Sequence, residues 1–457
     1  MSEFNDLLER QRAFFDSGRT LDLSFRKKQL VKLYEFLSDN EERIYEALWK
    51  DLRKSRYESF LTEVGTSKLE IGDLIKNLKK WAGPQKRPTP LLHFQGKSCV
   101  IPDPYGQNLI ISPWNYPFLL NVAPLGGAMA AGNTVIIKPS EISTATESLI
   151  SEMISELYED QYIACAKGGA KINQELLKMN FDHIFFTGSP RVGKIVMEAA
   201  SRLLTPVTLE LGGKNPVIVD QTADIDIAAK RIAWGKLLNG GQTCIAPDYL
   251  MVHNSVKNEF LERIIFYFEK FYGKDPVDNP EYLKIVNDQG FTRLNSLLKD
   301  QNIIYGGLSD PAERYLSPTL VDEPAHDSPI MEEEIFGPVL PVLGFDDKEK
   351  VIRFIRNRPK SLSLYFFTRS RATRKEFLER IPAGNVSIND TLVQFANPHL
   401  PFGGVGRSGM GTYHGKHSIE AFSHPKSVYR RTGFTDIVFR YPPYRNWYWK
   451  VVRLFLK

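Results

Sequence analysis

The stretch His183-Ile-Phe-Phe-Thr-Gly-Ser-Pro-Arg-Val-Gly-Lys194 decides the fold. An apolar, strand-like run leads into a glycine turn at Gly188, and a helical pattern follows the turn. The turn nearly spells a phosphate-binding loop, but Ile195 stands where a Ser or Thr hydroxyl would hold magnesium. Because a helix N-terminus with exposed amide groups still suits a phosphate, the stretch favours a dinucleotide pyrophosphate over a nucleoside triphosphate. Pro190 is a favourable first helical residue, although it removes one amide donor.

Similar strand-like runs recur on both sides of this stretch, and helical patterns separate them. They occupy residues 109–112, 134–137, 216–219 and 249–252, after a helical region that extends to about residue 80. Apolar runs that alternate with amphipathic helices predict βαβ units and a mostly parallel sheet. We place the seam between an N-terminal and a central domain at Leu211-Gly-Gly-Lys-Asn-Pro216.

Composition limits the class of protein. The 457 residues are enough for two or three domains. The formal charge of +5 is weak for this size, so we expect no nucleic-acid partner. Cys99, Cys165 and Cys244 are too few and too scattered for a disulfide framework or a zinc cluster, which indicates a reducing compartment. The acidic, polar start of the chain does not read as a secretory signal, and we expect a cytoplasmic protein.

One segment without charged residues, 105–137, is long enough to span a bilayer. It contains Pro113, Pro117 and Pro124, and prolines remove helical hydrogen bonds that lipid cannot replace. We therefore predict that this segment is buried core and not a membrane span.

The C-terminal tail, from Arg430 onward, is basic and aromatic, with seven Lys or Arg residues and one acid, Asp436. A helix over residues 446–457 would have an apolar face and a basic face. The apolar face would carry Trp447, Val451, Leu454 and Phe455, and the basic face Lys450, Arg453 and Lys457. Such faces suit an anionic membrane surface, and they suit equally a tail that docks on its own protein or on a neighbouring subunit. The tail is too short to span a bilayer.

Two further patterns are weak signals. Gly404-Val-Gly-Arg-Ser-Gly409 has the spacing of a dinucleotide-binding loop, but no βαβ unit is readable after it, so we expect a flexible loop. His414 and His417 have a spacing seen in metal sites, but no acidic or thiol partner is nearby in the sequence. We expect these histidines in a surface loop, and we expect no metal site.

Three side chains carry candidate chemistry. Cys244 lies among small and polar residues in Asn239-Gly-Gly-Gln-Thr-Cys-Ile-Ala-Pro-Asp248, which opens the thiol to a ligand; an inert buried cysteine is the alternative. Glu210 lies between two leucines, and apolar surroundings raise the proton affinity of a carboxylate, as a general base needs. Taken alone, it fits an ordinary strand-end carboxylate better. Asn115 lies in a turn bracketed by prolines, where its amide would face an oxyanion or satisfy the turn's own backbone.

Taken together, these segments resemble the aldehyde dehydrogenase superfamily, and specifically its class 3 branch for fatty or aromatic aldehydes. The matching motifs follow the family's order along most of the chain. They are Pro113-Trp-Asn-Tyr-Pro117, Gly132-Asn-Thr-Val-Ile-Ile-Lys-Pro-Ser-Glu141, Phe186-Thr-Gly-Ser189, Leu209-Glu-Leu-Gly-Gly-Lys214, Gly241-Gln-Thr-Cys-Ile-Ala-Pro-Asp248, Glu334-Ile-Phe-Gly-Pro338 and Pro401-Phe-Gly-Gly-Val-Gly406. The segment Ser408-Gly-Met-Gly-Thr-Tyr-His-Gly415 resembles class 3 more than the tetrameric classes.

The resemblance implies a mechanism in which three residues are catalytic. Cys244, as a thiolate, attacks the aldehyde carbon. The Asn115 amide and the Cys244 backbone N–H hold the resulting oxyanion. After hydride transfer to the nicotinamide leaves a thioester, Glu210 activates the water that releases the carboxylic acid. The implied substrates are medium or long aliphatic aldehydes or aromatic aldehydes, with Tyr116, Trp234 and Phe395 lining an apolar tunnel.

The resemblance also implies that the cofactor is NAD or NADP. The implied cofactor-binding residues are Lys138 and Glu141 at the adenosine ribose, Trp114, Gly188 and Ser189 near the pyrophosphate, and Glu334 and Phe336 at the nicotinamide end. Lys138 would welcome a 2′-phosphate and Glu141 would repel it, so the choice between the two cofactors stays open. Class 3 members usually have Thr where this chain has Pro190, which puts the number of amide contacts to the pyrophosphate in doubt.

From the resemblance we expect an α/β architecture and a homodimer. A Rossmann-like doubly wound cofactor domain would comprise residues 1–94 and 108–210, and an α/β catalytic domain residues 211–418. A small β bridging element for oligomerisation would comprise 95–107 and 419–440, followed by the tail at 441–457. Two other functions stay open: an acylating relative that passes the acyl group to coenzyme A, and a catalytically silent scaffold on the same fold.

Overall fold

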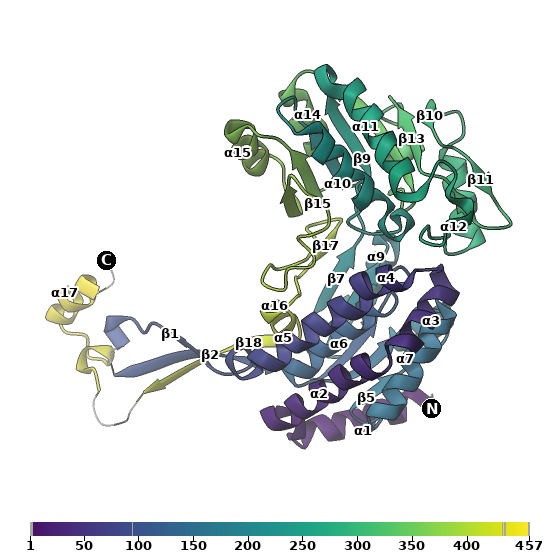
Figure 1. Cartoon of the computed structure of the whole chain (residues 1–457). Coiled ribbons are helices and arrows are strands. Elements are labelled where there is room, and N and C mark those ends of the chain that lie inside the picture. Colours follow the sequence, from purple (N-terminus) through teal and green to yellow (C-terminus); the bar gives the residue numbers. More distant parts are fainter. Residues whose placement is uncertain (1–2, 94, 432, 434–435, 456–457) are drawn as a thin grey trace.

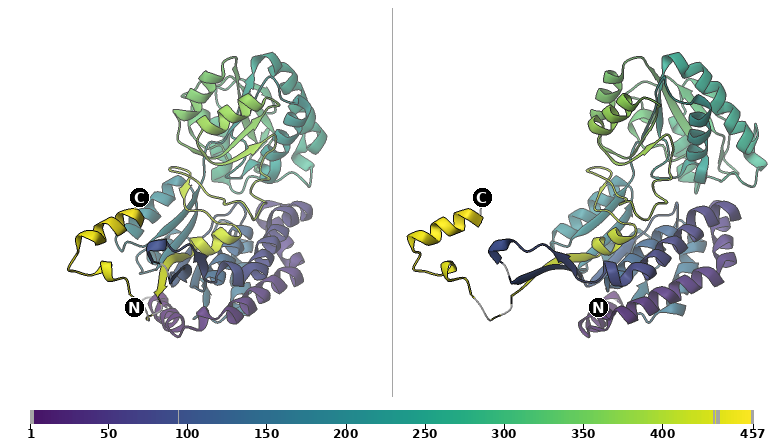
Figure 2. Two further views of the ribbon diagram at one scale, coloured as in Figure 1. Left: turned by 90° about the vertical axis from the view of Figure 1, so that its left-hand side faces the viewer. Right: turned by 60° about the vertical axis from the view of Figure 1, so that its left-hand side comes forward.

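The computed structural model describes residues 3–93, 95–431, 433 and 436–455. The chain forms two lobes, each built around its own sheet, and a slender arm that projects from the lower lobe (Figure 1). The views in Figure 2 show the same arm extending away from both lobes, with the C-terminal helix near its end. The predicted α/β fold class, with parallel-sheet Rossmann-like lobes and a small β element, is confirmed.

The lower lobe contains a six-stranded sheet. Its strands, in spatial order, are β17 (Gly409–Met410), β7 (Val207–Leu211), β6 (His183–Gly188), β3 (Gln107–Ile111), β4 (Thr134–Lys138) and β5 (Ile163–Cys165). All neighbours are parallel except β17, which runs antiparallel to β7. The stretch that opened the sequence analysis therefore forms β6 and the start of a helix, as predicted.

Helices cover both faces of this sheet because apolar side chains alternate along its strands. Leu109 and Ile111 point to one face and Ile110 to the other, and each face packs in a separate core cluster. Each fully buried side chain of this kind contributes about 1.5–3 kcal/mol. The helices are α1 (Glu3–Asp16), α2 (Leu23–Asp39), α3 (Glu41–Leu52), α4 (Arg56–Ser59), α5 (Gly65–Trp81), α6 (Leu119–Ala131), α7 (Thr144–Leu157), α8 (Ala170–Leu176), α9 (Pro190–Ser201) and α16 (Lys416–Ala421), with η1 (Arg19–Leu21) and the π-helical turn η2 (Phe60–Val64).

The order of the strands creates a binding crevice. The chain winds from β3 outward through β4 to β5, then returns to the other side of β3 as β6. The carboxyl ends of β3 and β6 therefore diverge at a topological switch point, where open α/β sheets bind ligands. Trp114 and Asn115 follow β3, and Ser189 follows β6. The fold thus brings together motifs that lie some distance apart in the sequence.

The upper lobe contains a seven-stranded sheet, with parallel pairing except at β10. In spatial order its strands are β10 (Ile303–Tyr305), β13 (Thr319–Asp322), β14 (Val339–Phe345), β9 (Tyr249–His253), β8 (Pro216–Val219), β15 (Ser361–Phe367) and β16 (Ala383–Ile388). A short hairpin, β11 (Ser309–Asp310) and β12 (Tyr315–Leu316), lies beside it. The helices are α10 (Ile225–Leu237), α11 (Asn254–Tyr272), α12 (Asp288–Leu297), α13 (Pro329–Glu332), α14 (Lys348–Arg356) and α15 (Arg371–Arg380), with η4 (Leu238–Gly241) and η5 (Pro276–Asp278).

The arm is a three-stranded antiparallel sheet in the order β1 (Gln85–Arg87), β2 (Gly96–Pro104) and β18 (Ser423–Arg431). β2 and β18 belong to the predicted bridging element, and β1 precedes its expected start. The chain passes from the lower to the upper sheet between Leu211 and Pro216, at the predicted seam. β17 pairs with β7 of the lower sheet, although its residues were predicted to belong to the catalytic domain. The exact domain bounds stay predictions.

The segment without charged residues, 105–137, forms β3, α6 and β4, and nearly all of it is buried, as predicted. No helix in the described part of the chain has both the length and the hydropathy needed to cross a bilayer. The tail forms η6 (Val438–Arg440) and the predicted helix, α17 (Asn446–Phe455); Lys457 lies outside the described residues.

One face of α17 packs against the chain near the end of the arm, and the other face is exposed. Tyr448 is buried and packs near Phe439, at 6.4 Å between ring centroids. Trp447 and Leu454, predicted for a shared apolar face, are 52% and 71% exposed. Only Val451 of the expected apolar set is half-buried among the side chains that the structure describes. The helix therefore packs on the chain through Tyr448, and Trp447 and Leu454 of the expected apolar face stay exposed.

Candidate active site

A cleft of about 1280 Å³ lies between the two lobes. Cys244, Glu210 and Asn115 all line it, although more than 120 residues separate the first from the last in the sequence. Asn115 comes from the turn after β3, Glu210 from β7 and Cys244 from the loop before β9. Three of the side chains that the sequence singled out for their chemistry therefore face one cavity.

A left-handed loop carries Cys244. After α10, Asn239, Gly240 and Gly241 have φ angles of 55°, 60° and 74°. A Cβ at Gly241 would lie 2.3 Å from the Gly337 carbonyl oxygen, so only glycine fits there. The Cys244 carbonyl accepts a hydrogen bond from Asn215 Nδ2 at 2.8 Å, which fixes the loop to the start of the upper sheet.

The electrostatics at Cys244 favour the neutral thiol. Burial raises the pKa of the Cys244 thiol well above its usual range, and the negative charges of Glu334 and Glu210 raise it further. A thiolate is the nucleophilic form. Reaction at this sulfur therefore requires a base or a nearby positive charge.

Glu210 is a buried carboxylate, only 4% exposed, on an inner strand of the lower sheet. Neither of its carboxylate oxygens has a hydrogen-bond partner among the described residues. Desolvation raises the pKa of Glu210 well above its ordinary value. An unpartnered carboxylate with a raised pKa is a strong base when ionised, which suits proton abstraction from water. An ordinary structural carboxylate in such a place would be paired.

The Asn115 amide is buried and held by one of its two N–H groups. Its Nδ2 donates to the Gln242 carbonyl at 3.0 Å, two residues before Cys244. Because a primary amide has two N–H donors, one remains to face the cleft. Asn115 is therefore available as an oxyanion donor in the cleft that Cys244 also lines, and this role stays a prediction.

Five of the predicted cofactor residues line the same cleft: Trp114, Gly188, Ser189, Glu334 and Phe336. The Trp114 and Phe336 rings meet edge to face, with centroids 5.4 Å apart. Ser189 caps α9 by accepting from Val192 N at 3.4 Å. Glu334 Oε1 accepts from Gly213 N at 3.0 Å, and burial, with Asp248 nearby, raises the pKa of Glu334 to about 8.

Lys138 is the last residue of β4, and it bonds to Glu141 three residues further along the chain. Lys138 Nζ donates to Glu141 Oε2 at 2.9 Å and to the Pro139 carbonyl at 2.5 Å. The lysine is buried, whereas the side chain of Glu141 is 41% exposed. An adenosine ribose or a 2′-phosphate would have to compete with this ion pair for the lysine.

The residues present fit a nicotinamide dinucleotide. The cleft joins the thiol to the N-terminus of α9, a twelve-residue helix whose dipole favours an anion. A Cβ at Gly188 would lie 2.6 Å from the Phe186 ring, so a larger residue in the turn before this helix would have to displace that ring. Pro190 leaves Arg191 as the first residue after Ser189 with a backbone N–H.

The predicted substrate-pocket residues lie outside the cleft. Tyr116, Trp234 and Phe395 are absent from its lining among the described residues. The Tyr116 hydroxyl bonds to Thr243 Oγ1 at 2.7 Å, and Phe395 packs against His414 at 4.6 Å between ring centroids. Their role toward an aldehyde stays a prediction.

The expectation of a surface loop at His414 was wrong. His414 is fully buried, and its Nδ1 lies 2.5 Å from Glu70 Oε1, a distant carboxylate that sequence spacing did not reveal. Most of the 404–409 segment is a loop, as predicted, and its end is held in the lower sheet. Gly409 begins β17 and pairs with Glu210, and the Ser408 carbonyl accepts from Leu211 N at 3.1 Å. No group of three or more metal-ligating side chains was found in the described chain.

Comparison with known proteins identifies the family. The sequence profile of the "Aldehyde dehydrogenase family" matches residues 2–428. The chain belongs to the aldehyde dehydrogenase family. It is 46% identical to the 4,4'-diaponeurosporen-aldehyde dehydrogenase of Staphylococcus aureus over 98% of this chain and 97% of the relative. It is 42% identical to the dimeric NADP-preferring aldehyde dehydrogenase of Rattus norvegicus over 97% of this chain and 98% of the relative.

Comparison with a solved structure supports the same family. A substrate-bound state of Staphylococcus aureus AldH superimposes with a TM-score of 0.97 at 45% identity, covering all of both chains. The predictions of the family and of an aldehyde dehydrogenase enzyme are confirmed. The predicted cofactor, NAD or NADP, is confirmed as the one that this family uses.

Proposed function

We propose that this aldehyde dehydrogenase oxidises medium or long aliphatic aldehydes, or aromatic aldehydes, to carboxylic acids through a thioester on Cys244. One observation carries the proposal. The thiol, the unpartnered Glu210 carboxylate and the spare Asn115 N–H share one cleft with the N-terminus of α9. Tyr116, Trp234 and Phe395 are the proposed lining of an apolar substrate tunnel that would lead to the cleft, although none of them lines the cleft itself.

The residues divide the reaction between them. The Cys244 thiolate adds to the aldehyde carbon, and the Asn115 amide with the Cys244 backbone N–H stabilises the oxyanion. A nicotinamide held in the cleft would supply the hydride acceptor, and loss of hydride from this carbon would leave a thioester on Cys244. Glu210 then takes a proton from water as the water oxygen attacks the thioester, and the C–S bond breaks to release the acid and the thiolate.

The cofactor would be held along the cleft. Glu334 and Phe336 would contact its nicotinamide end, Trp114, Gly188 and Ser189 its pyrophosphate, and Lys138 with Glu141 its adenosine ribose. Lys138 can turn to the 2′-phosphate of NADP only when the Glu141 carboxylate releases it. The ion pair is therefore compatible with either NAD or NADP.

An aldehyde panel tests this function. The purified enzyme is mixed with NAD or NADP and with aldehydes of increasing chain length, benzaldehyde and diaponeurosporen-aldehyde, and reduced nicotinamide is followed by absorbance. We expect turnover that improves with apolar length and disappears in the Cys244→Ala variant. Short polar aldehydes as the best substrates, or full activity of Cys244→Ala, would contradict the proposal.

Transfer to coenzyme A is the alternative outcome for the thioester. Glu210 argues against it, because an acylating enzyme needs no water-activating base. Adding coenzyme A to the assay and measuring acyl-CoA distinguishes the two. We expect the free acid as the product with or without coenzyme A.

We further propose that α17 contacts an anionic membrane surface at its periphery. Its outward side exposes Trp447, Trp449 and Leu454 beside Lys450 and Arg453. Aromatic rings suit the headgroup region, and each basic residue near an anionic surface contributes about 1 kcal/mol. A surface contact would bring the cleft close to apolar aldehydes that dissolve in lipid.

Co-sedimentation with phosphatidylglycerol-containing vesicles tests this contact. We expect the full chain to pellet in a salt-sensitive way, and both a chain ending at Pro443 and a Trp447→Ala/Trp449→Ala variant to stay in solution. Trp49→Ala is the matched control, because Trp49 is 45% exposed on α3, away from the tail. Equal pelleting of all variants would exclude the tail.

We also propose a cytoplasmic homodimer that forms through the arm. β18 is an edge strand of nine residues, and the edge away from β2 is unpaired within the described chain. Unpaired edges of this length readily accept a strand or surface from another chain. The name of the rat relative, a dimeric enzyme, agrees with this assembly.

A further inference from the structure

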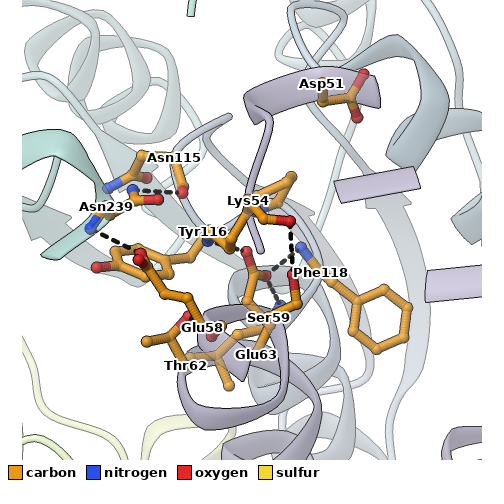
Figure 3. Close-up of polar contacts among 12 residues, drawn as sticks. Asp51, Lys54, Glu58, Ser59, Thr62, Glu63, Asn115, Tyr116, Phe118 and Asn239 are labelled. Atoms are coloured by element: carbon orange, nitrogen blue, oxygen red, sulfur yellow. Dashed lines mark hydrogen bonds and ion pairs between the residues drawn. The ribbon is translucent and has the colours of Figure 1, made fainter. Parts of the chain in front are cut away.

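Residues 54–63 lie next to the turn that carries Asn115 (Figure 3). This segment comprises α4 and most of the π-helical turn η2. It buries three ionisable side chains, Lys54, Glu58 and Glu63, of which none belongs to the catalytic set. Buried charges are expensive unless they are bonded, so their partners indicate what they do.

Glu63 holds the downstream end of the Asn115 turn. Its Oε2 accepts from Phe118 N at 2.9 Å and from Leu119 N at 3.0 Å, where α6 begins. Its Oε1 pairs with Lys54 Nζ at 2.5 Å, and both side chains are fully buried. The Lys54 ammonium also lies 4.3 Å from the centre of the Tyr116 ring. The backbone on that side of Asn115 is therefore fixed.

Glu58 supports the other side of the Asn115 turn through the loop that carries Cys244. Its Oε1 accepts from Asn239 N at 2.7 Å. Asn239 Nδ2 then donates to the Asn115 carbonyl at 2.9 Å and to the Gln242 carbonyl at 3.1 Å. The Gln242 carbonyl is also the acceptor for the Asn115 side-chain amide. A continuous chain of hydrogen bonds thus connects Glu58 to the proposed oxyanion donor.

Asn239 has a left-handed backbone, with a φ of 55°, which asparagine adopts more readily than most non-glycine residues. Its N–H is buried and donates to Glu58, so the carboxylate satisfies a backbone donor that water does not reach. Burial raises the pKa of Glu58 to about 7, partly offset by Lys54. Ionisation of the Glu58 carboxyl group therefore costs free energy at this buried position. The group lies two hydrogen bonds away from the Asn115 turn.

We propose that Glu58 is a positioning residue for the Asn115 amide. It acts through Asn239 and does not touch the substrate. The inference rests on the proposed function, in which Asn115 stabilises the oxyanion of the Cys244 adduct. Without the Glu58 acceptor, Asn239 loses its orientation, the Gln242 carbonyl shifts, and the free N–H of Asn115 turns away from the reacting oxygen.

The test compares Glu58→Leu, which removes the acceptor at similar volume, with Glu58→Gln, whose amide oxygen still accepts from Asn239. Misplacement of a catalytic group by about 1 Å can lower a rate roughly 100-fold. We expect Glu58→Leu to lower kcat and kcat/KM by roughly tenfold or more, with cofactor Kd unchanged. Glu58→Gln is expected to retain activity within about threefold, since it preserves the hydrogen bond.

A double-mutant cycle with Asn115→Ala separates positioning from general damage. Asn115→Ala alone should lower kcat by roughly 100-fold or more, as loss of an oxyanion donor does. If Glu58 acts through Asn115, Glu58→Leu/Asn115→Ala should be no slower than Asn115→Ala within about twofold. Multiplied effects in the double variant would overturn the proposal.

A stability control completes the experiment. Phe377→Leu, on the buried side of α15 and outside the cleft lining, should lower the unfolding temperature without lowering kcat. If Glu58→Leu does not fold, low activity of a folded Glu58→Gln variant overturns the inference by itself. If the unchanged enzyme oxidises no aldehyde, the proposed function fails; normal turnover by folded Glu58→Leu overturns only the role of Glu58.

Discussion

At the residue scale, the site combines two groups whose protonated forms are favoured. Burial raises the pKa of both Cys244 and Glu210, and each must lose its proton to act. The sequence predicted these residue types and their neighbours, since the flanking leucines of Glu210 already indicated desolvation. It did not predict Glu58 or Asn239 as supports, because their bonds join segments more than 100 residues apart.

These shifts predict an alkaline rise in activity. The ordinary pKa values are 9.0 for the thiol and 4.5 for the carboxyl group, and both shifts are upward, so the active ionisation states become more populated as pH increases. We expect kcat/KM to rise between pH 6 and 9, by up to about tenfold per pH unit for one controlling group. The measurement is a pH profile of initial rates, with thermal unfolding recorded at each pH. A flat or falling profile for folded enzyme would contradict these assignments.

At the element scale, the strand-turn-helix at 183–194 was predictable because its signals are local. A short continuous run of apolar residues indicates the strand, and Gly188, Ser189 and Pro190 indicate the turn and the helix start. The pairing of strands that lie far apart in the sequence was harder to predict. The β17 pairing with β7 joins residues about 200 positions apart and contains only two residues, so no periodicity marks it. The His414–Glu70 contact was missed for the same reason.

The N-terminus of α9 gives a prediction with a matched control. Ser189→Ala removes an N-cap, which destabilises a helix by about 1 kcal/mol, and it also alters the proposed pyrophosphate site. We expect a severalfold rise in the KM for NAD or NADP with little change in kcat. Ser370→Ala removes the equivalent cap of α15, outside the cleft. It should lower stability by a similar amount and leave the cofactor KM unchanged; equal KM values for both variants would exclude Ser189 from the site.

At the scale of the whole molecule, residues of both lobes line the cleft. The arm extends away from the lobes (Figures 1 and 2). The sequence predicted the lobes through their βαβ pattern, and the resemblance supplied the bridging element. The side of α17 that packs on the chain was not predicted from the sequence. Helical periodicity shows which residues share a face but does not reveal which face meets a partner.

The arm predicts a dimer in solution. One chain has a mass of 52.1 kDa, so sedimentation or light scattering should give about twice that mass at micromolar concentration. Hydrogen exchange should show protected amide groups along both edges of β18. A 52.1 kDa particle with a rapidly exchanging outer edge would contradict assembly through the arm.

The thioester on Cys244 is the central claim, and the Glu210→Gln variant tests it most directly. Without the base, hydrolysis should stall after the oxidation step. The variant is incubated with decanal and NAD or NADP, and its intact mass is measured, followed by mapping of the modified peptide. The account predicts one decanoyl group on Cys244 and about one reduced nicotinamide per active site. Reduced nicotinamide without any acyl group on Cys244, or an acyl group on another residue, would contradict it.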